Sequence, residues 1–496
     1  MKIFSAAQIK NWDAFTIENE PIESGELMER AALACCRWIL DHKYSHRNFL
    51  IFCGTGNNGG DGLAIGRILL QSNCSATVYI TGETGTRDFE ANLEKIQLHG
   101  GLLPEILTPG TLPVITPDMV VVDALIGTGL NRPPAGISAE LIDHINNGTA
   151  PVISIDMPSG LFADKSSKGN SIVKATHTLT FQQFKLAFLL PENDPYCGEV
   201  HILNIGLDKT FENETAVAFE MAERTLIRSI CKPRKKFSHK GNYGHAALLC
   251  GSYGMIGAAV LAAHSCLRSG AGKLTSYIPE CGYTTLQSIV PEAMCVVSGE
   301  KNIADAEGIG AFDAIGIGPG IGKFPSQVSL LRTVFTQAKK SLLIDADALN
   351  MIAGNKELIG LIPFSSVLTP HPGEFERLFG AVDNDFERLQ LALKKSAELQ
   401  VYIVLKGQYS FIATPEGKGW FNSTGNSGMA TAGSGDVLSG FITGLLAQGY
   451  PPLQAALIGV YLHGLAGDIA SQKHSPEAMI AGDIVDCLGE AFKLIS

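Results

Sequence analysis

The stretch at residues 426–440 (NSGMATAGSGDVLSG) constrains the fold of this chain more than any other part of the sequence. It begins as a loop of small residues and becomes apolar at Val437, after which Leu438, Phe441 and Leu445 recur at helical spacing. A glycine loop that leads into a helix exposes several backbone N–H groups, and the helix dipole adds partial positive charge there. The stretch therefore predicts a place where a phosphate or a developing oxyanion binds.

Asp436 is the one acidic residue of this stretch. A carboxylate at a helix start can cap the helix, a contribution of about 1 kcal/mol. It can also stand beside the anion-binding amides as a general base for a substrate hydroxyl. A Gly-Asp pair alone favours capping, whereas the whole run is more specific, so both roles stay open at this point.

Length and composition predict a multidomain protein that does not bind nucleic acid. A chain of 496 residues holds about two to three domains of ~100–200 residues each. The net charge of −11 argues against a nucleic-acid groove. The N-terminus lacks the apolar core of a signal peptide, and no run reaches the ~20 apolar residues of a membrane helix. The 11 cysteines contain no C-x-x-C pair, so we expect reduced thiols in a soluble, cytoplasmic protein.

Short apolar runs alternate with helical patterns along the whole chain. This alternation predicts two α/β domains with parallel sheets and helices on both faces. We place the first domain at 1–220, a charged and polar linker at 221–236, and the second domain at 237–496. In such sheets ligands bind at the carboxyl ends of the strands.

The first polar cluster follows the expected strand at 48–53. The loop at 54–62 lacks the P-loop pattern, and its resemblance to the dinucleotide pattern G-x-G-x-x-G is weak. Asn57, Asn58 and Asp61 nevertheless offer amide and carboxylate groups where a structural turn needs only glycine.

Two aspartates end the next strands of the first domain. Asp123 and Asp156 each follow an apolar run, where either could be a strand-end cap. Together, Asn58, Asp123 and Ser159 supply only oxygen ligands, which suit a hard cation. Asp156 has a neighbouring loop that contains Gly127 and Gly129, whose amides could hold a phosphate.

The second domain places its polar residues at expected strand ends, in 318–320, 345–350, 369–374 and 406–407. His371 is either a hydrogen-bonded loop histidine or a ligand contact. Lys406 is either an edge lysine with its head in water or a partner of a nucleotide phosphate. Asp345 and Asp347 either cap the next helix or orient Mg²⁺ through water.

The first domain resembles the NAD(P)H-hydrate epimerases over about 200 residues, through the motifs NNGGDG at 57–62 and DMPSG at 156–160. This resemblance implies a Rossmann-like three-layer fold. It further implies that Asp156 contacts the hydrated dinucleotide and is the acid–base residue, and that K⁺ binds Asn58, Asp123 and Ser159. The other implied substrate contacts are Asn57, Asn58, Gly59, Gly60, Asp61, Gly127, Thr128, Gly129, Leu130, Asn131, Arg132 and Pro133.

From Lys240 to its end the chain resembles the ribokinase-like ADP- or ATP-dependent NAD(P)H-hydrate dehydratases, through the 426–440 stretch and the strand-end motifs. The resemblance implies ADP as the phosphoryl donor, although ATP stays open, and Mg²⁺ in this site. The implied contacts to the hydrated dinucleotide are Ala258, Gly320, His371 and Asp436. Those to the nucleotide are Lys406, Gly407, Gln408, Tyr409, Ser410 and Gly435, within 406–410 and 426–435.

The two resemblances together imply a homo-oligomeric enzyme that repairs hydrated NADH and NADPH. One domain would interconvert the R and S forms, and the other would dehydrate the S form with ADP, giving NAD(P)H, AMP and phosphate. The rival hypothesis is a ribokinase-like small-molecule kinase fused to a non-catalytic nucleotide-binding module. The products distinguish the two, because a kinase leaves a stable phosphoester.

Overall fold

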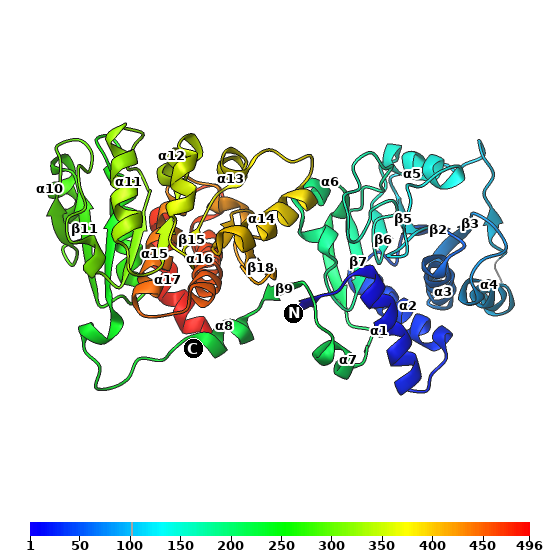
Figure 1. The fold of residues 1–496 in the computed structure, drawn as a ribbon. Coiled ribbons are helices and arrows are strands. Elements are labelled where there is room, and N and C mark those ends of the chain that lie inside the picture. Colours follow the sequence, from blue (N-terminus) through cyan, green and yellow to red (C-terminus); the bar gives the residue numbers. More distant parts are fainter. Residues whose placement is uncertain (101–102) are drawn as a thin grey trace. The chain divides into compact units, whose positions relative to one another are not determined.

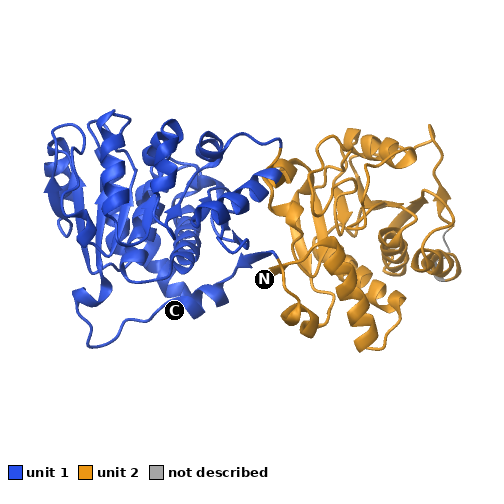
Figure 2. Ribbon diagram, in the orientation of Figure 1, with its two compact units in different colours: residues 1, 218–383, 387–496 blue, residues 2–217, 384–386 orange. Residues whose placement is uncertain are grey.

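The computed structural model describes residues 1–100 and 103–496, which form two compact α/β units (Figure 1; Figure 2). The N-terminal unit comprises residues 2–217 and 384–386. The C-terminal unit comprises residue 1, residues 218–383 and residues 387–496.

The segment 221–236, which we expected to be a linker, belongs in large part to the C-terminal unit. β9 (Phe219–Ala222) pairs in parallel with β18 (Gly419–Asn422) at one side of that unit's sheet. α8 (Arg224–Ile230) follows, and its Ile227 is completely buried in the same unit's core. The sequence hid both elements because β9 has only four residues and most side chains of α8 are polar and exposed.

The N-terminal unit is built on an all-parallel sheet with the strand order β4-β3-β2-β5-β6-β7-β8. Its strands are β1 (Lys2–Ile3), β2 (Asn48–Cys53), β3 (Ser75–Ile80), β4 (Glu105–Ile106), β5 (Met119–Ala124), β6 (Val152–Ile155), β7 (His177–Phe181) and β8 (Glu199–Leu203). Its helices are α1 (Ala6–Asn19), α2 (Ser24–Asp41), α3 (Asn57–Gln71), α4 (Arg87–Gly100), α5 (Ile137–Asn147), α6 (Asp194–Cys197) and α7 (Lys209–Glu214), with 3₁₀ turns η1 (Leu186–Leu189) and η2 (Pro191–Asn193).

Alternate residues of the central strand serve the two faces of this sheet. Ile51 of β2 packs in one core with side chains of α2, α3 and α4, whereas Leu50 packs in a second core with side chains of α5. This alternation follows from the two-residue period of a strand. The expected three-layer arrangement of the first domain is confirmed.

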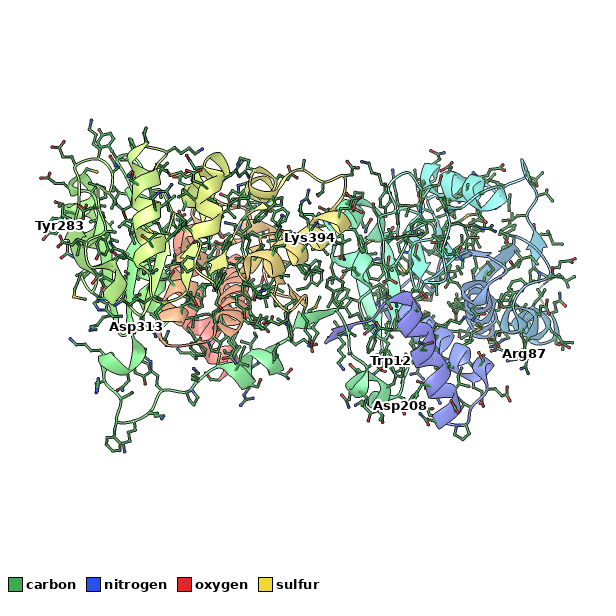
Figure 3. All side chains as sticks on the ribbon, in the orientation of Figure 1. Trp12, Arg87, Asp208, Tyr283, Asp313 and Lys394 are labelled. Carbon is green, nitrogen blue, oxygen red and sulfur yellow. The ribbon has the colours of Figure 1, made fainter. Side chains whose placement is uncertain are left out.

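α1 packs against the last segment of the N-terminal unit, near Asp208. Ser5 caps the helix in a reciprocal capping box with Gln8. The buried indole of Trp12 donates a hydrogen bond from Nε1 to the carbonyl oxygen of Asp208 at 2.7 Å, and both residues are labelled in Figure 3. This contact fixes α1, and with it the neighbouring Asp13, within the unit.

The C-terminal unit has a sheet in the order β9-β18-β17-β16-β15-β14-β13-β10-β11-β12, in which β17 alone runs antiparallel to its neighbours. Its further strands are β10 (His245–Leu249), β11 (Lys273–Ile278), β12 (Met294–Val297), β13 (Ala314–Ile317), β14 (Leu342–Ile344), β15 (Val367–Leu368), β16 (Tyr402–Leu405) and β17 (Phe411–Ala413). Its further helices are α9 (Ile256–Arg268), α10 (Glu280–Ile289), α11 (Ser326–Gln337), α12 (Ala346–Gly354), α13 (Pro372–Phe379), α14 (Asp385–Leu399), α15 (Ser434–Ala447), α16 (Pro452–His474) and α17 (Ala481–Ile495), with 3₁₀ turns η3 (Lys240–Tyr243), η4 (Ile309–Ala311), η5 (Lys356–Leu361) and η6 (Ser427–Met429).

α16 corrects our expectation that no segment is long and apolar enough to cross a membrane. It is the one helix in the described part of the chain that meets this criterion by length and composition. However, 72% of its apolar window is buried inside the protein, where it packs with α9, α15 and α17 in one core. A mostly buried core helix passes the same test, so α16 is weak evidence for a membrane span.

Candidate active sites

Close backbone packing positions the first turn of α3 at the end of β2. A Cβ on Gly54 would lie 2.0 Å from the carbonyl oxygen of Leu125, and a Cβ on Gly59 would lie 1.7 Å from that of Gly54. Both positions therefore require glycine. The turn that results buries Asn58 and Asp61 and leaves Asn57 exposed.

The buried amide of Asn58 has no hydrogen-bond partner for either its oxygen or its nitrogen. Buried polar atoms without partners are rare in proteins. A Cβ on Gly127 would lie 3.3 Å from Cγ of Asn58 and 3.1 Å from Oδ2 of Asp156. The three predicted residues Asn58, Gly127 and Asp156 thus converge, and the unsatisfied amide indicates a ligand at this point.

Asp123 and Ser159, two of the predicted cation ligands, are in direct contact. Asp123 is fully buried and accepts hydrogen bonds from the Ser159 hydroxyl at 2.5 Å, the Ser159 amide at 2.9 Å and the Ser154 hydroxyl at 2.8 Å. Burial raises the pKa of Asp123, and the hydrogen bonds from Ser159 oppose that effect. With the unsatisfied Asn58 oxygen nearby in the same unit, the donor chemistry fits a hard cation.

Asp156 is held by partners on both of its carboxylate oxygens. Its backbone is left-handed, with φ at 64°, a conformation that is uncommon for residues other than glycine. Oδ1 accepts from Nζ of Lys185 at 2.7 Å, and Oδ2 accepts from the amide of Thr128 at 3.2 Å. Lys185 is 1% exposed and also donates to the Thr180 hydroxyl at 2.7 Å and the Phe181 carbonyl at 3.0 Å.

Sequence reasoning missed Lys185 and Asp13. The pKa of Asp13 is raised to about 7, chiefly by burial and then by the charge of Asp156, against the opposing charge of Lys185. Burial likewise raises the pKa of Asp61, with Asp156 and Asp13 adding to it. The only sequence signal for Lys185 is a lone cation between Phe184 and Leu186, four residues after β7 ends at Phe181.

The other predicted substrate contacts differ in their placement. Gly60 is buried against Met28, whose Sδ would lie 2.8 Å from an added Cβ. In the 127–133 loop, Leu130 is half-buried, whereas Gly129, Asn131, Arg132 and Pro133 are exposed. The structure therefore brings Gly127 and Thr128 to Asp156 and leaves the rest of the loop as an outer rim.

The start of α15 forms the core of the second site. The N-cap is Gly433, in a left-handed conformation with φ at 89°, and Asp436 lies in the first turn without making a capping hydrogen bond. Asp436 is therefore not the N-cap residue of α15, and its role as a base stays a prediction. Burial, and then the charge of Asp345, raises the pKa of Asp436 to about 6, against the opposing charge of Lys406. A carboxylate of this kind accepts a hydroxyl proton more readily than an exposed one.

An ion pair with a buried carboxylate faces this helix start. Asp345 is 1% exposed and contacts Nζ of Lys406 at 2.8 Å and the Ser439 hydroxyl at 2.5 Å. Glu374 lies 3.9 Å from the same ammonium. Burial lowers the pKa of Lys406, but Asp345 and Glu374 outweigh burial and raise it. A Cβ on Gly435 would lie 3.4 Å from Nζ of Lys406, so this lysine is an inward-facing cation rather than an edge residue.

The predicted substrate contacts of the second site occupy two places. Gly320 has φ at 61°, and a Cβ there would lie 3.0 Å from that of Ala258, so these two are neighbours. His371 caps α13, because its Nδ1 accepts from the Gly373 amide at 3.0 Å. His371 therefore makes a local hydrogen bond through Nδ1, and its role as a ligand contact stays a prediction.

The predicted nucleotide contacts Gly407, Gln408, Tyr409 and Ser410 form a turn after β16. Gln408 donates from Nε2 to the carbonyl oxygen of Gly425 at 3.1 Å, which joins this turn to the glycine-rich loop. His463, which sequence reasoning missed, supports the other end of the loop with Nε2 at 3.0 Å from the Ser434 carbonyl. Burial lowers the pKa of His463 to about 4, so it is a neutral supporting residue.

Comparisons with known proteins agree with this division. A family model described as NAD(P)H-hydrate dehydratase matches residues 246–489, and one described as YjeF-related protein N-terminus matches residues 24–187. A solved ribokinase-like superfamily protein from Enterococcus faecalis V583 is 28% identical, covers 57% of this chain and 98% of its own, and aligns with a TM-score of 0.50. The expected ribokinase-like fold of the C-terminal unit is confirmed.

Two curated relatives span both units. The bifunctional NAD(P)H-hydrate repair enzyme Nnr of Moorella thermoacetica is 36% identical, over 98% of this chain and 96% of its own length. The enzyme of the same name from Escherichia coli is 33% identical, over 93% of this chain and 88% of its own length. The chain therefore belongs to the family of bifunctional NAD(P)H-hydrate repair enzymes.

Proposed function

We infer that this enzyme repairs hydrated nicotinamide cofactors, with the N-terminal unit as epimerase and the C-terminal unit as ADP-dependent dehydratase. The observation that carries the proposal is the half-buried Asp436 in the first turn of α15, a helix that starts at Gly433 and faces Lys406. This arrangement offers a base, a cation and backbone donors at one point, which is what phosphoryl transfer to a hydroxyl needs.

In the proposed dehydratase reaction Asp436 takes the proton of the hydroxyl on the hydrated ring while that oxygen receives a phosphoryl group from ADP. The amides of residues 433–435 and the Lys406 ammonium stabilise the charge on the transferred group. The lone pair of the ring nitrogen then expels phosphate, and loss of a proton from the adjacent carbon restores NAD(P)H. AMP and phosphate are the other products.

We assign Ala258, Gly320 and His371 to the dinucleotide side of this site, and residues 406–410 and 426–435 to the nucleotide side. Mg²⁺, when bound, would neutralise charge on the donor's phosphates. Asp347 is a candidate to orient it through water, because its carboxylate already holds the Gly322 amide at 3.0 Å beside the 318–322 loop.

In the epimerase site we propose that Asp156 moves protons on and off the hydrated ring. Lys185 and the Thr128 amide hold its carboxylate in one orientation. Asn58, Asp123 and Ser159 would hold K⁺, which would fix the 126–128 segment next to the substrate, since the Ile126 amide donates to the Ser159 hydroxyl at 2.9 Å.

The decisive experiment supplies hydrated NADPH with ADP or ATP and follows the recovery of NADPH absorbance. Stoichiometric NADPH, AMP and free phosphate with ADP support the proposal, whereas a stable phosphoester supports the rival kinase.

A fragment of residues 218–496, which keeps β9 and α8, should dehydrate only one of the two hydrate epimers. We expect a cytoplasmic homo-oligomer, which light scattering and cell fractionation test.

A further inference from the structure

Three potential metal ligands meet on the last two strands of the N-terminal sheet, away from the proposed epimerase site. β7 and β8 pair in parallel, with His177 opposite Glu199 and Leu179 opposite His201. Because side chains alternate along a strand, Glu199 and His201 share the face on which His177 lies. Among the described residues, these three form the one group of His, Cys, Asp and Glu side chains close enough to hold a metal ion.

The distances within this group match the size of a metal ion. Nδ1 of His177 lies 3.2 Å from Nε2 of His201. Oε2 of Glu199 lies 3.7 Å from the former and 3.8 Å from the latter. A circle through three atoms with these separations has a radius of about 2.1 Å, which is the usual length of a Zn–N or Zn–O bond, about 2.0–2.2 Å. One ion could therefore contact all three atoms without a movement of either strand.

The surroundings hold both imidazoles in place and leave one side open. Trp38 of α2 packs against both rings, with centroid separations of 5.0 Å to His177 and 4.6 Å to His201. The Glu199 side chain is 71% exposed, so water can reach the position of a fourth ligand.

The group is separate from the proposed epimerase site along the same strand. His177 begins β7, whereas Lys185, the partner of Asp156, hydrogen-bonds to Phe181 at the other end of that strand. Four residues of strand correspond to about 13 Å. An ion at the group would lie at the amino end of β7, whereas the epimerase residues lie at the carboxyl ends of the strands.

We propose that His177, Glu199 and His201 bind one divalent transition-metal ion, with Zn²⁺ as the preferred occupant and water as its fourth ligand. Two imidazoles and one carboxylate with an open position suit Zn²⁺ and exclude the hard cations that prefer all-oxygen sites. The ion joins β8, the edge strand of the sheet, to β7 and stabilises that edge.

The test compares zinc binding by the full chain and by matched variants. Chelator-treated wild type, the double variant Glu199→Gln/His201→Gln and the control His46→Ala, which removes an exposed histidine outside the group, are titrated with Zn²⁺ against a chromophoric chelator. The wild type and His46→Ala should each bind one more equivalent than the double variant. The cysteine background is the same in all three proteins, so it cancels in the comparison.

A second measurement separates a site from general loss of structure. Saturating Zn²⁺ should raise the Tm of the wild type and of His46→Ala and leave that of the double variant unchanged, because an ion that binds only the folded state stabilises it. Glu199→Gln alone changes an exposed side chain. It should lower the affinity for the extra Zn²⁺ ion by about 10-fold or more, while the Tm of the metal-free protein stays the same. Equal zinc stoichiometry and affinity in wild type and double variant would show that the group is only a hydrogen-bonded histidine pair.

Discussion

The central aspartates of the two proposed sites have contrasting surroundings. Asp156 accepts from a buried lysine at 2.7 Å and from a backbone amide, on a left-handed backbone. Asp436 lies in a regular helical turn, and within the described residues no ion pair involves it; its pKa is raised to about 6 by burial and by the nearby Asp345. One carboxylate is held in a fixed orientation by a cation, while the other is kept basic by its surroundings.

The difference corresponds to two kinds of proton chemistry. A phosphoryl acceptor needs one proton removed once, which a basic carboxylate does well near neutral pH. An epimerase must return the proton that it removes. A carboxylate held in one orientation by Lys185 and the Thr128 amide can both remove and return that proton. The following changes test whether the two environments, rather than the two aspartates, set these roles.

Asp436→Asn should have the largest effect. Dehydration should fall by ~10²-fold or more, the usual contribution of a positioned base. Because the Asp436 side chain is not the N-cap of α15, the free energy of unfolding should change by well under ~1 kcal/mol. Single-turnover kinetics with ADP, alongside epimer exchange as an internal control, measure this. Turnover within a few-fold of the wild type would remove Asp436 as the base.

Lys185→Met should affect the other unit. It leaves the Asp156 carboxylate without its cation, so epimer exchange should slow by about 10–100-fold while dehydration stays unchanged. Breaking a buried ion pair costs about 3–5 kcal/mol, so the N-terminal unit should also unfold at lower denaturant. Lys174→Met, at an exposed lysine of the same unit, is the matched control. Wild-type exchange in a folded Lys185→Met protein would contradict the positioning role.

Asp123→Ala should slow epimer exchange by about tenfold and abolish any dependence of that exchange on K⁺. The reason is that Asp123 is the only carboxylate among the three proposed ligands, and its hydrogen bonds also hold Ser159. Dehydration serves as the control activity. Equal losses in both reactions would indicate general unfolding and contradict a local cation site.

The pH dependence should show the smallest effect. The pKa of Asp436 is about 6, and the base must be ionised to act, so dehydration should be half-maximal near pH 6 and constant above it. Below that pH the rate should fall about tenfold per unit. The residual activity of Asp436→Asn should lack this acidic limb. A wild-type profile that is flat from pH 5 to 8 would contradict the raised pKa.

Local sequence patterns were sufficient to place most site residues on the correct elements. Apolar runs followed by Asp156 or Lys406 define strand ends, and Asp123 lies one residue before the end of β5, because the two-residue and 3.6-residue periods are properties of neighbouring residues. The glycine-rich stretch before Val437 likewise marked a helix start, although the helix begins three residues earlier, at Ser434. The resemblance carried by the short motifs then indicated the family.

The sequence by itself determined the alternation of strands and helices within each unit, although not β9 and α8, and the aspartates and glycines near their ends, because these depend on contacts within a few residues. Only the tertiary structure decided that Lys185 pairs with Asp156, that β9 and α8 belong to the C-terminal unit, and that His177 meets His201. Each of these joins residues on neighbouring strands or separate elements, and which strands are neighbours follows from the packing of the whole sheet rather than from any local pattern.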